Sequence, residues 1–261
     1  MTRNRWTPWD AAPGTDGGAE AVRVYCLPHA GGSAGSYLAW SRSREVPAGL
    51  EFVPVELPGR GTRLREPLLA SMDEVVDGLL TMLAERPEEE RFLLLGHSMG
   101  AQIAYETTRR LAAEGGRPLP RAVVVSGCRP PGAPVALPLH DRSDEELLRG
   151  VIELGGTPAE ILEHRELLEM LLPVIRADLG LLARYMTDVR PTVLPCPVVA
   201  LGGADDRLAG PEWITGWRAM TADGFRHRVL PGDHFFLHTE SAEVMAEIAA
   251  VVREHAAPTT G

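Results

Sequence analysis

A serine stands between two glycines in the five residues Gly96-His97-Ser98-Met99-Gly100, a spacing that suits nucleophilic catalysis. An apolar run, residues 91–95, precedes them, and a helical pattern follows from Ala101. In the order strand, G-x-S-x-G, helix, this motif predicts a nucleophile elbow, a sharp turn that lifts the serine off the end of a buried strand. Glycines on both sides remove side chains that would collide, and the amides at the helix start face negative charge near Ser98. The alternative is a structural turn, because a bare G-x-S-x-G also arises by chance.

The Ser98 hydroxyl needs a base, and eight histidines compete for that role. We predict His234, because it lies just past the last expected strand, where the order serine, acid, histidine places the base. His238, one helical turn further on, stays open as the alternative. His97 cannot easily turn back to its neighbour Ser98, and His29 belongs to a glycine-rich loop. Four more fall on helices, helix approaches or mid-strand: His140, His164, His227 and His255.

The acid of such a triad holds the imidazole tautomer and stabilises the imidazolium. Two aspartates end the strand that precedes the histidine, Asp205 and Asp206. We predict Asp206, because Arg207-Leu208 follows it in the register common for this acid. Asp205 stays open, with capping of the next helix as its structural role.

An oxyanion hole requires two backbone amides. One is expected from Met99, directly after the nucleophile, and the other from the loop His29-Ala30-Gly31-Gly32 after the first strand. We predict the Ala30 amide, with Gly31 as the second choice and a plain glycine turn as the structural alternative.

Strands that alternate with helices must position these groups. Six stretches are expected strands: residues 21–27, 51–57, 91–95, 122–126, 197–201 and 225–230. Helices are expected over 36–43 and from a capping box at Ser71, and Gly115-Gly116 ends the helix after the elbow. The alternation predicts an α/β fold with a mostly parallel central sheet and helices on both faces.

The expected domain organisation is a core, residues 21–128 and 191–256, preceded by a flexible arm, residues 1–20, rich in Pro, Gly and Asp. Residues 129–190 carry helical signals alone, including capping boxes at Ser143 and Thr157. We interpret this insertion as a lid over the site, since loops at strand carboxyl ends face the site in such folds. The alternative is a packed structural excursion.

Composition excludes several classes of function. A formal net charge of −10 argues against nucleic acid or an anionic membrane as partner, and no apolar run approaches the roughly 20 residues of a membrane span. All 26 basic residues are arginine, which excludes a P-loop lysine, a Schiff-base lysine and a Ser-Lys dyad. No ligand spacing indicates a metal. Without a signal peptide, we expect a cytoplasmic protein with three buried free thiols, Cys26, Cys128 and Cys196.

Several segments together resemble the type II (editing) thioesterases of polyketide and nonribosomal peptide synthetase systems, within the α/β-hydrolase superfamily. They are residues 27–33, residues 56–61, the elbow with His97 and Met99, residues 201–206, residues 232–237, and within the insertion residues 154–158 and 172–178. The resemblance covers nearly the whole chain after residue 20. Asp233 departs from it, because the family usually has glycine before the histidine; the base stays in place.

The resemblance implies an α/β-hydrolase fold and hydrolysis of acyl groups from the phosphopantetheine arms of acyl or peptidyl carrier proteins. No cofactor is implied, since the arm enters with the substrate, and the family habit is a monomer. Arg60, Arg63 and Arg65 form a hypothetical docking patch for the acidic carrier, with a solvated arginine-rich loop as the alternative. Two other functions stay open: a general carboxylesterase or peptidase with the same triad, and a catalytically silent binding scaffold.

Overall fold

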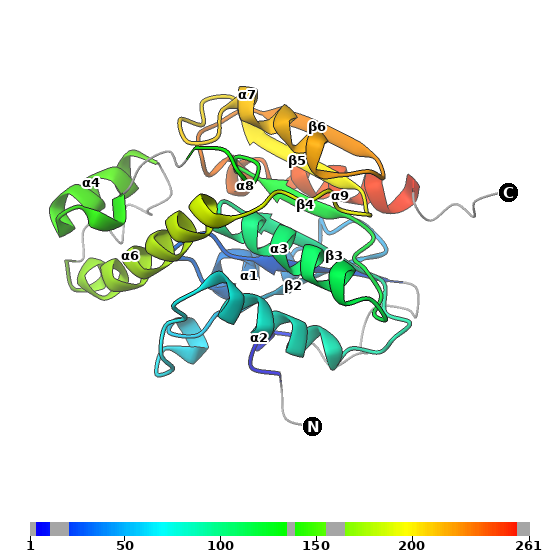
Figure 1. Cartoon of the computed structure of the whole chain (residues 1–261), viewed down its shortest axis with the longest axis horizontal. Coiled ribbons are helices and arrows are strands. Elements are labelled where there is room, and N and C mark those ends of the chain that lie inside the picture. The colour runs from blue at the N-terminus through cyan, green and yellow to red at the C-terminus, as the bar shows by residue number, and fades with distance from the viewer. Residues whose placement is uncertain (1–3, 11–20, 135–138, 155–164, 255–261) are drawn as a thin grey trace, which may run out of the picture.

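The computed structural model describes residues 4–10, 21–134, 139–154 and 165–254. Its centre is a six-stranded sheet in the order β2-β1-β3-β4-β5-β6, in which every neighbouring pair is parallel (Figure 1). The strands are β1 (Val22–Leu27), β2 (Leu50–Pro54), β3 (Phe92–His97), β4 (Val123–Ser126), β5 (Val198–Gly203) and β6 (Phe225–Leu230). The predicted α/β architecture is confirmed, and parallel strands bring all the carboxyl ends to one edge of the sheet.

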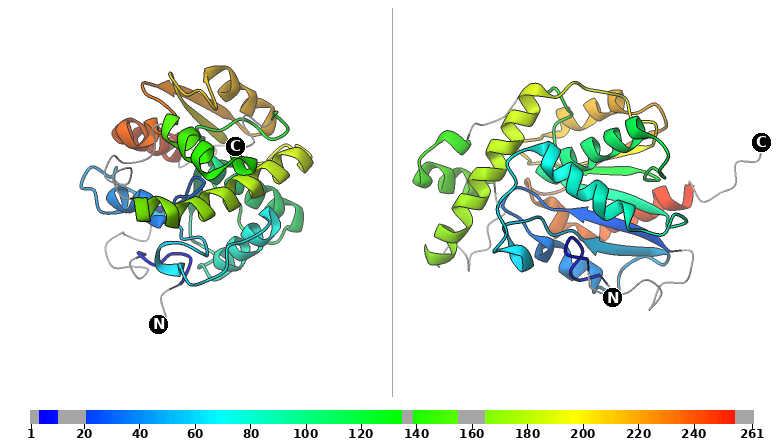
Figure 2. Two further views of the ribbon diagram at one scale, coloured as in Figure 1. Left: turned by 90° about the vertical axis from the view of Figure 1, so that its left-hand side faces the viewer. Right: turned by 60° about the horizontal axis from the view of Figure 1, so that its bottom comes forward.

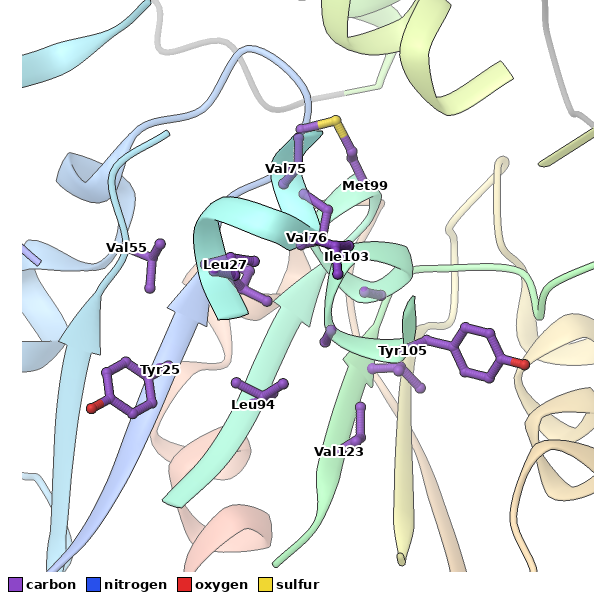
Figure 3. Packing of buried hydrophobic residues seen from close by; sticks show 14 of the residues in the cluster. Tyr25, Leu27, Val55, Val75, Val76, Leu94, Met99, Ile103, Tyr105 and Val123 are labelled. Atoms are coloured by element: carbon purple, nitrogen blue, oxygen red, sulfur yellow. The ribbon is translucent and has the colours of Figure 1, made fainter. Parts of the chain in front are cut away.

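Helices cover both faces of the sheet, so the buried strands are apolar on both sides. The main helices are α1 (Leu38–Ser41), α2 (Met72–Ala84), α3 (Met99–Glu114), α7 (Pro211–Ile214), α8 (Phe236–Thr239) and α9 (Ser241–Glu254). Along β1, Tyr25 and Leu27 pack in the cluster with α2 and α3, whereas Val24 and Cys26 pack in the cluster with α9. Figure 3 shows the first cluster, where side chains from α2 and α3 meet those of the strands.

Helix boundaries follow local capping chemistry. Ser71 accepts a hydrogen bond from the Glu74 amide at 3.2 Å and starts α2, as predicted. Gly115, at φ +66°, ends α3. The helix expected over 36–43 is instead a 3-10 turn (Ala34–Tyr37) followed by the single turn of α1.

The chain between β4 and β5 contains helices and no strand in its described part. Helix α4 (Asp144–Glu153) begins with a complete capping box of Ser143 and Glu146, and α6 (Arg165–Asp188) follows. Figure 2 shows both helices together at one end of the molecule. The capping box expected at Thr157 lies outside the described residues. The domain boundaries and the lid role stay predictions.

The start of the chain differs from the loose arm expected over residues 1–20. Residues 4–10 lie against the core, because Trp6 fills the space above Gly78, where a Cβ would lie 2.1 Å from the indole ring. The Trp6 carbonyl accepts a 2.7 Å hydrogen bond from the Glu56 amide. A partly buried indole packed against a helix stabilises the attachment of a segment that composition alone would leave loose.

Cys26, Cys128 and Cys196 are free and buried, as expected, and burial raises the pKa of Cys128 and of Cys196 to about 12. These thiols therefore pack as small apolar side chains rather than as nucleophiles. Among the helices of the described residues, none has both the length and the apolar character of a membrane span.

Candidate active site

Ser98 lies at the sharp turn between β3 and α3, with φ 54° and ψ −117°. It is the sole non-glycine residue with positive φ in the described part of the chain. Its amide donates to the Ser126 carbonyl of β4 at 2.8 Å, which holds the turn against the sheet. A backbone in this sparsely populated region persists only where its surroundings enforce it. The predicted elbow geometry is therefore present.

The two glycines of the motif are required by close backbone approach. A Cβ on Gly96 would lie 2.0 Å from the Gly100 carbonyl oxygen, and a Cβ on Gly100 would lie 2.2 Å from the Leu27 carbonyl oxygen. Both neighbours are backbone atoms, so they cannot move aside as a flexible side chain would. The spacing read from the sequence thus has a steric cause at each end.

His234 and Asp206 form a buried pair at the carboxyl end of the sheet. His234 Nδ1 lies 2.9 Å from Asp206 Oδ2, and both residues are at most 5% exposed. Asp206 Oδ1 accepts hydrogen bonds from the amides of Leu208 and Ala209, at 2.8 and 3.0 Å. Burial alone would raise the pKa of Asp206, but the hydrogen bond and charge of His234, with the two amides, lower it below its ordinary value. The carboxylate is thus held ionised against the imidazole.

The structure brings together Asp206 and His234, the acid and base predicted from the sequence, and not their alternatives. Asp205 is exposed, and its amide bonds to the Gly232 carbonyl at 2.9 Å, while His238 is also exposed. Asp233 accepts a hydrogen bond from the Phe235 amide at 2.8 Å, so the departure from the family pattern caps a turn beside His234. His164 and His255 lie outside the described residues.

His234 lies next to the elbow through Gly127, the residue after β4. A Cβ on Gly127 would lie 3.4 Å from His234 Cε1 and 2.6 Å from His97 Cε1, and Gly127 follows the residue that binds the Ser98 amide. The described residues form no hydrogen bond between the Ser98 hydroxyl and the His234 ring. Such bonds often close only when substrate is bound, so this geometry is compatible with a nucleophile and its base.

His97 points away from its neighbour Ser98, as expected. Its Nδ1 lies 3.0 Å from the Ser126 hydroxyl, and its ring centroid lies 5.0 Å from that of His234. Burial, together with the charges of the nearby histidines, lowers the pKa of His97 well below its ordinary value. A neutral His97 therefore packs beside His234 without adding a positive charge to the site.

The loop after β1 is fixed by hydrogen bonds at several backbone atoms. The Gly31 amide donates to Asp178 Oδ2 at 2.7 Å, and the Ala34 amide donates to Glu56 Oε1 at 3.0 Å. The Gly31 amide is thus occupied, whereas the described residues form no hydrogen bond with the Ala30 amide. Met99 is the first residue of α3, where amides have no partner within the helix. The two amides expected for an oxyanion hole are therefore the ones left available.

Glu56 and Asp178 are site residues that sequence reasoning missed. Both are at most 4% exposed, and both accept hydrogen bonds from the loop that contains Ala30. The one signal in the sequence was their place at the ends of two segments that carry the family resemblance, residues 56–61 and 172–178. Spacing along the chain does not show that these carboxylates meet the same loop.

The docking patch predicted from three arginines is wrong for two of them. Arg60 is 5% exposed and binds Asp178 through both guanidinium nitrogens. Arg63 is 9% exposed and pairs with Glu66 at 2.7 Å. Of the three, Arg65 alone is exposed. Buried guanidinium groups paired with carboxylates present no free charge to a partner.

We expect acid to destabilise the protein partly through His29. Burial, then the charges of His238, His234 and Arg60, lowers the pKa of His29 from 6.5 to about 3. In the unfolded chain His29 therefore binds a proton near pH 6.5, whereas in the folded chain it binds one only near pH 3. The contribution of neutral His29 to the free energy of unfolding is therefore complete above pH 6.5 and is lost as pH falls below it. Between pH 7 and 5, the free energy of unfolding of wild type should fall by about 1–2 kcal/mol more than that of His29→Phe.

Urea unfolding at the two pH values measures this difference. His227→Phe, on exposed β6, is the matched control and should follow wild type. Equal pH dependence in wild type and His29→Phe would contradict the assignment of a neutral His29 in the folded protein.

The parallel sheet, the strained serine turn and the buried aspartate–histidine pair define a serine hydrolase of the α/β-hydrolase superfamily. The chain belongs to the thioesterase family, whose domain model, described as Thioesterase domain, matches residues 22–252. The family resemblance noted from the sequence is thereby confirmed.

Named relatives agree with this membership. A "Probable cadicidin biosynthesis thioesterase" of Streptomyces griseus is 39% identical over 244 residues, 92% of this chain and 65% of that relative's length. The solved structure of the RedJ thioesterase, from the prodiginine pathway of Streptomyces coelicolor, is 34% identical with a TM-score of 0.82, covering 96% of this chain and 100% of that one. The structure of the type II thioesterase BorB, from the borrelidin cluster, is 32% identical with a TM-score of 0.81, covering 96% and 99%.

Proposed function

We propose that the protein is an editing thioesterase, which hydrolyses stalled or aberrant acyl groups from the phosphopantetheine arms of acyl or peptidyl carrier proteins in polyketide or nonribosomal peptide biosynthesis. The observation that carries the proposal is the Asp206–His234 pair beside the strained Ser98 turn, in a chain of the thioesterase family. The names of its relatives support the biosynthetic setting. A monomeric state and a cytoplasmic location stay predictions.

In the acylation half of the proposed reaction, the Ser98 hydroxyl attacks the thioester carbonyl while His234 takes its proton. Asp206 holds His234 in the tautomer that leaves Nε2 free to accept that proton, and its carboxylate stabilises the imidazolium. The tetrahedral oxyanion receives hydrogen bonds from the Met99 and Ala30 amides. The carbon–sulfur bond then breaks, and the phosphopantetheine thiolate leaves with the carrier, protonated by His234 where required.

In the second half, His234 removes a proton from water, which attacks the acyl–Ser98 ester. The same two amides bind the second oxyanion, and its collapse returns the proton to Ser98 and releases a free carboxylic acid. A thiolate leaves far more readily than an amine, so modest acid assistance is sufficient. An enzyme that removes many different acyl groups has no need to bind any one of them tightly.

Bulk charge does not explain recognition of the carrier. Carrier proteins are usually acidic and this chain has a net charge of −10, so long-range attraction would not steer the two together. With Arg60 and Arg63 buried, these two guanidinium groups cannot dock the carrier. We expect specificity for the carrier to come from local contacts around the entrance to the site.

The test is hydrolysis of short acyl groups from a phosphopantetheinylated carrier protein, compared with the matching oxygen ester. Turnover of the carrier thioester in preference to the ester supports the proposal. Turnover of the ester alone would make the protein a general carboxylesterase. No turnover of either substrate, with no labelling by a serine-directed fluorophosphonate, would favour a silent binding scaffold.

A further inference from the structure

We propose that Asp178, on the inserted helix α6, is a positioning residue that holds the oxyanion loop in its active shape. The oxyanion loop is defined here as residues 29–34, after β1. This inference rests on the proposed function, because it concerns the Ala30 amide of the proposed oxyanion hole. Asp178 does not touch the reacting atoms in this assignment; it acts through the backbone of Gly31.

Asp178 is 4% exposed, and its carboxylate contacts the loops that follow β1 and β2. Oδ2 accepts the Gly31 amide at 2.7 Å and a guanidinium nitrogen of Arg60, and Oδ1 accepts the second Arg60 nitrogen at 2.8 Å. A bidentate guanidinium fixes the plane of the carboxylate and so directs Oδ2 at Gly31. Arg60 also compensates the buried charge, without which the carboxylate would be strongly destabilising.

Ile175 brings a second contact from the same face of α6, one turn before Asp178. A Cβ on Gly31 would lie 2.3 Å from Ile175 Cγ1, so the helix packs directly onto the Gly31 backbone. Gly31 also has φ +77°, which favours glycine. Helix α6 thus fixes this residue both by packing and by a charge-assisted hydrogen bond.

Other hydrogen bonds hold the rest of the oxyanion loop and leave the Ala30 amide without a partner among the described residues. The Gly32 amide donates to the His29 carbonyl at 2.9 Å, and Arg60 donates to the Gly32 carbonyl at 3.3 Å. Glu56 accepts the Ala34 amide at 3.0 Å. With both neighbours of Ala30 held, its amide has a fixed direction before substrate arrives, and preorganised donors are what stabilise an oxyanion without a cost of reorganisation.

A consequence is that α6 and the oxyanion loop move together. Asp178 and Gly31 are 147 residues apart in sequence, and the bond between them joins the insertion to the first loop of the core. A displacement of α6 would withdraw Asp178 and Ile175 from Gly31 and release the loop.

The decisive comparison uses two double variants that both lack the ion pair. Arg60→Met/Asp178→Asn removes both charges but keeps an oxygen that can accept the Gly31 amide. Arg60→Met/Asp178→Leu removes the acceptor as well. Because the loss of the ion pair is common to both, the difference between them isolates the contact with Gly31. If the Leu double variant does not fold, as judged by circular dichroism, Asp178→Ala replaces Asp178→Leu in the same background.

Three quantities are measured well below the melting temperatures of the two double variants. Two are kcat and KM for hydrolysis of an acyl carrier thioester. The third is the affinity for a trifluoromethyl ketone analogue, whose adduct with Ser98 carries an oxyanion. We expect kcat of the Leu variant to be at least about 10-fold below that of the Asn variant, since loss of a whole oxyanion donor costs about 10²–10³-fold. KM should differ by less than about threefold, and affinity for the analogue should fall in parallel with kcat/KM.

Asp188→Leu, at the exposed end of α6, is the control for changes on this helix and should match wild type. Equal kcat and equal analogue affinity in the two folded double variants would overturn the positioning role and leave Asp178 as a partner of Arg60 alone. Failure of the proposed function is distinct, because wild type itself would then show no turnover of the carrier thioester.

Discussion

Replacement of Ser98 by alanine should lower kcat on a carrier thioester by about 10⁴-fold or more, the loss found when a triad nucleophile is removed. The physical reason is specific to this serine. Its backbone, at φ 54°, directs the side chain away from β3 and toward the loops at the carboxyl edge of the sheet. Neither His234 nor water can replace a nucleophile held against the substrate carbonyl. Steady-state hydrolysis and fluorophosphonate labelling measure the effect, and labelling should disappear entirely.

The fold should survive this change, because alanine removes one oxygen and keeps the Cβ that the turn already accommodates. Ser43→Ala, in the turn after α1, is a control that removes a hydroxyl away from the elbow. It should retain activity and labelling. A Ser98→Ala protein that melts like wild type and still hydrolyses the thioester would refute the nucleophile assignment.

The sheet and the serine turn are predictable because local patterns determine them. Strands β1 to β5 are short apolar runs with residues packed on both faces of the sheet, so composition alone marks them, whereas most of β6 is exposed or half-buried. Gly96 and Gly100 are fixed by contacts of the turn with itself and with β1, and such contacts leave a readable spacing. The same holds for Ser71 and Ser143, whose hydrogen bonds lie within their own helix.

Contacts between distant segments left no comparable pattern. Arg60 looks like a surface charge in the sequence, and only the carboxylate of Asp178, which reaches it from α6, allows its burial. Trp6 lies in a segment of loop-like composition, yet it packs on Gly78 of a helix that follows much later. The role of Asp178 depends on a loop 147 residues away. Tertiary partners decide these positions, and propensity does not specify them.

The second large effect on kcat is expected at Asp206, the acid predicted in preference to its neighbour Asp205. Asp206→Asn should lower kcat by about 10³–10⁴-fold, because an amide can favour the wrong tautomer of His234 and cannot stabilise the imidazolium. Asp205→Asn is a control that differs by one position and makes the same chemical change. Since Asp205 is exposed and contacts its surroundings through its backbone amide, this variant should keep nearly full activity.

The distinction has a structural origin that the sequence could not supply. Asp206 turns its side chain inward because its own Oδ1 accepts the amides of Leu208 and Ala209, which leaves Oδ2 for His234. Asparagine can keep the two amide bonds through its oxygen, so the loop should hold its shape and the melting temperature should change little. The loss would then fall on kcat rather than on KM, since the pair acts on the proton transfer and not on substrate binding. Equal kcat in Asp205→Asn and Asp206→Asn would remove Asp206 from the triad, whereas a loss confined to Asp205→Asn would reassign the acid.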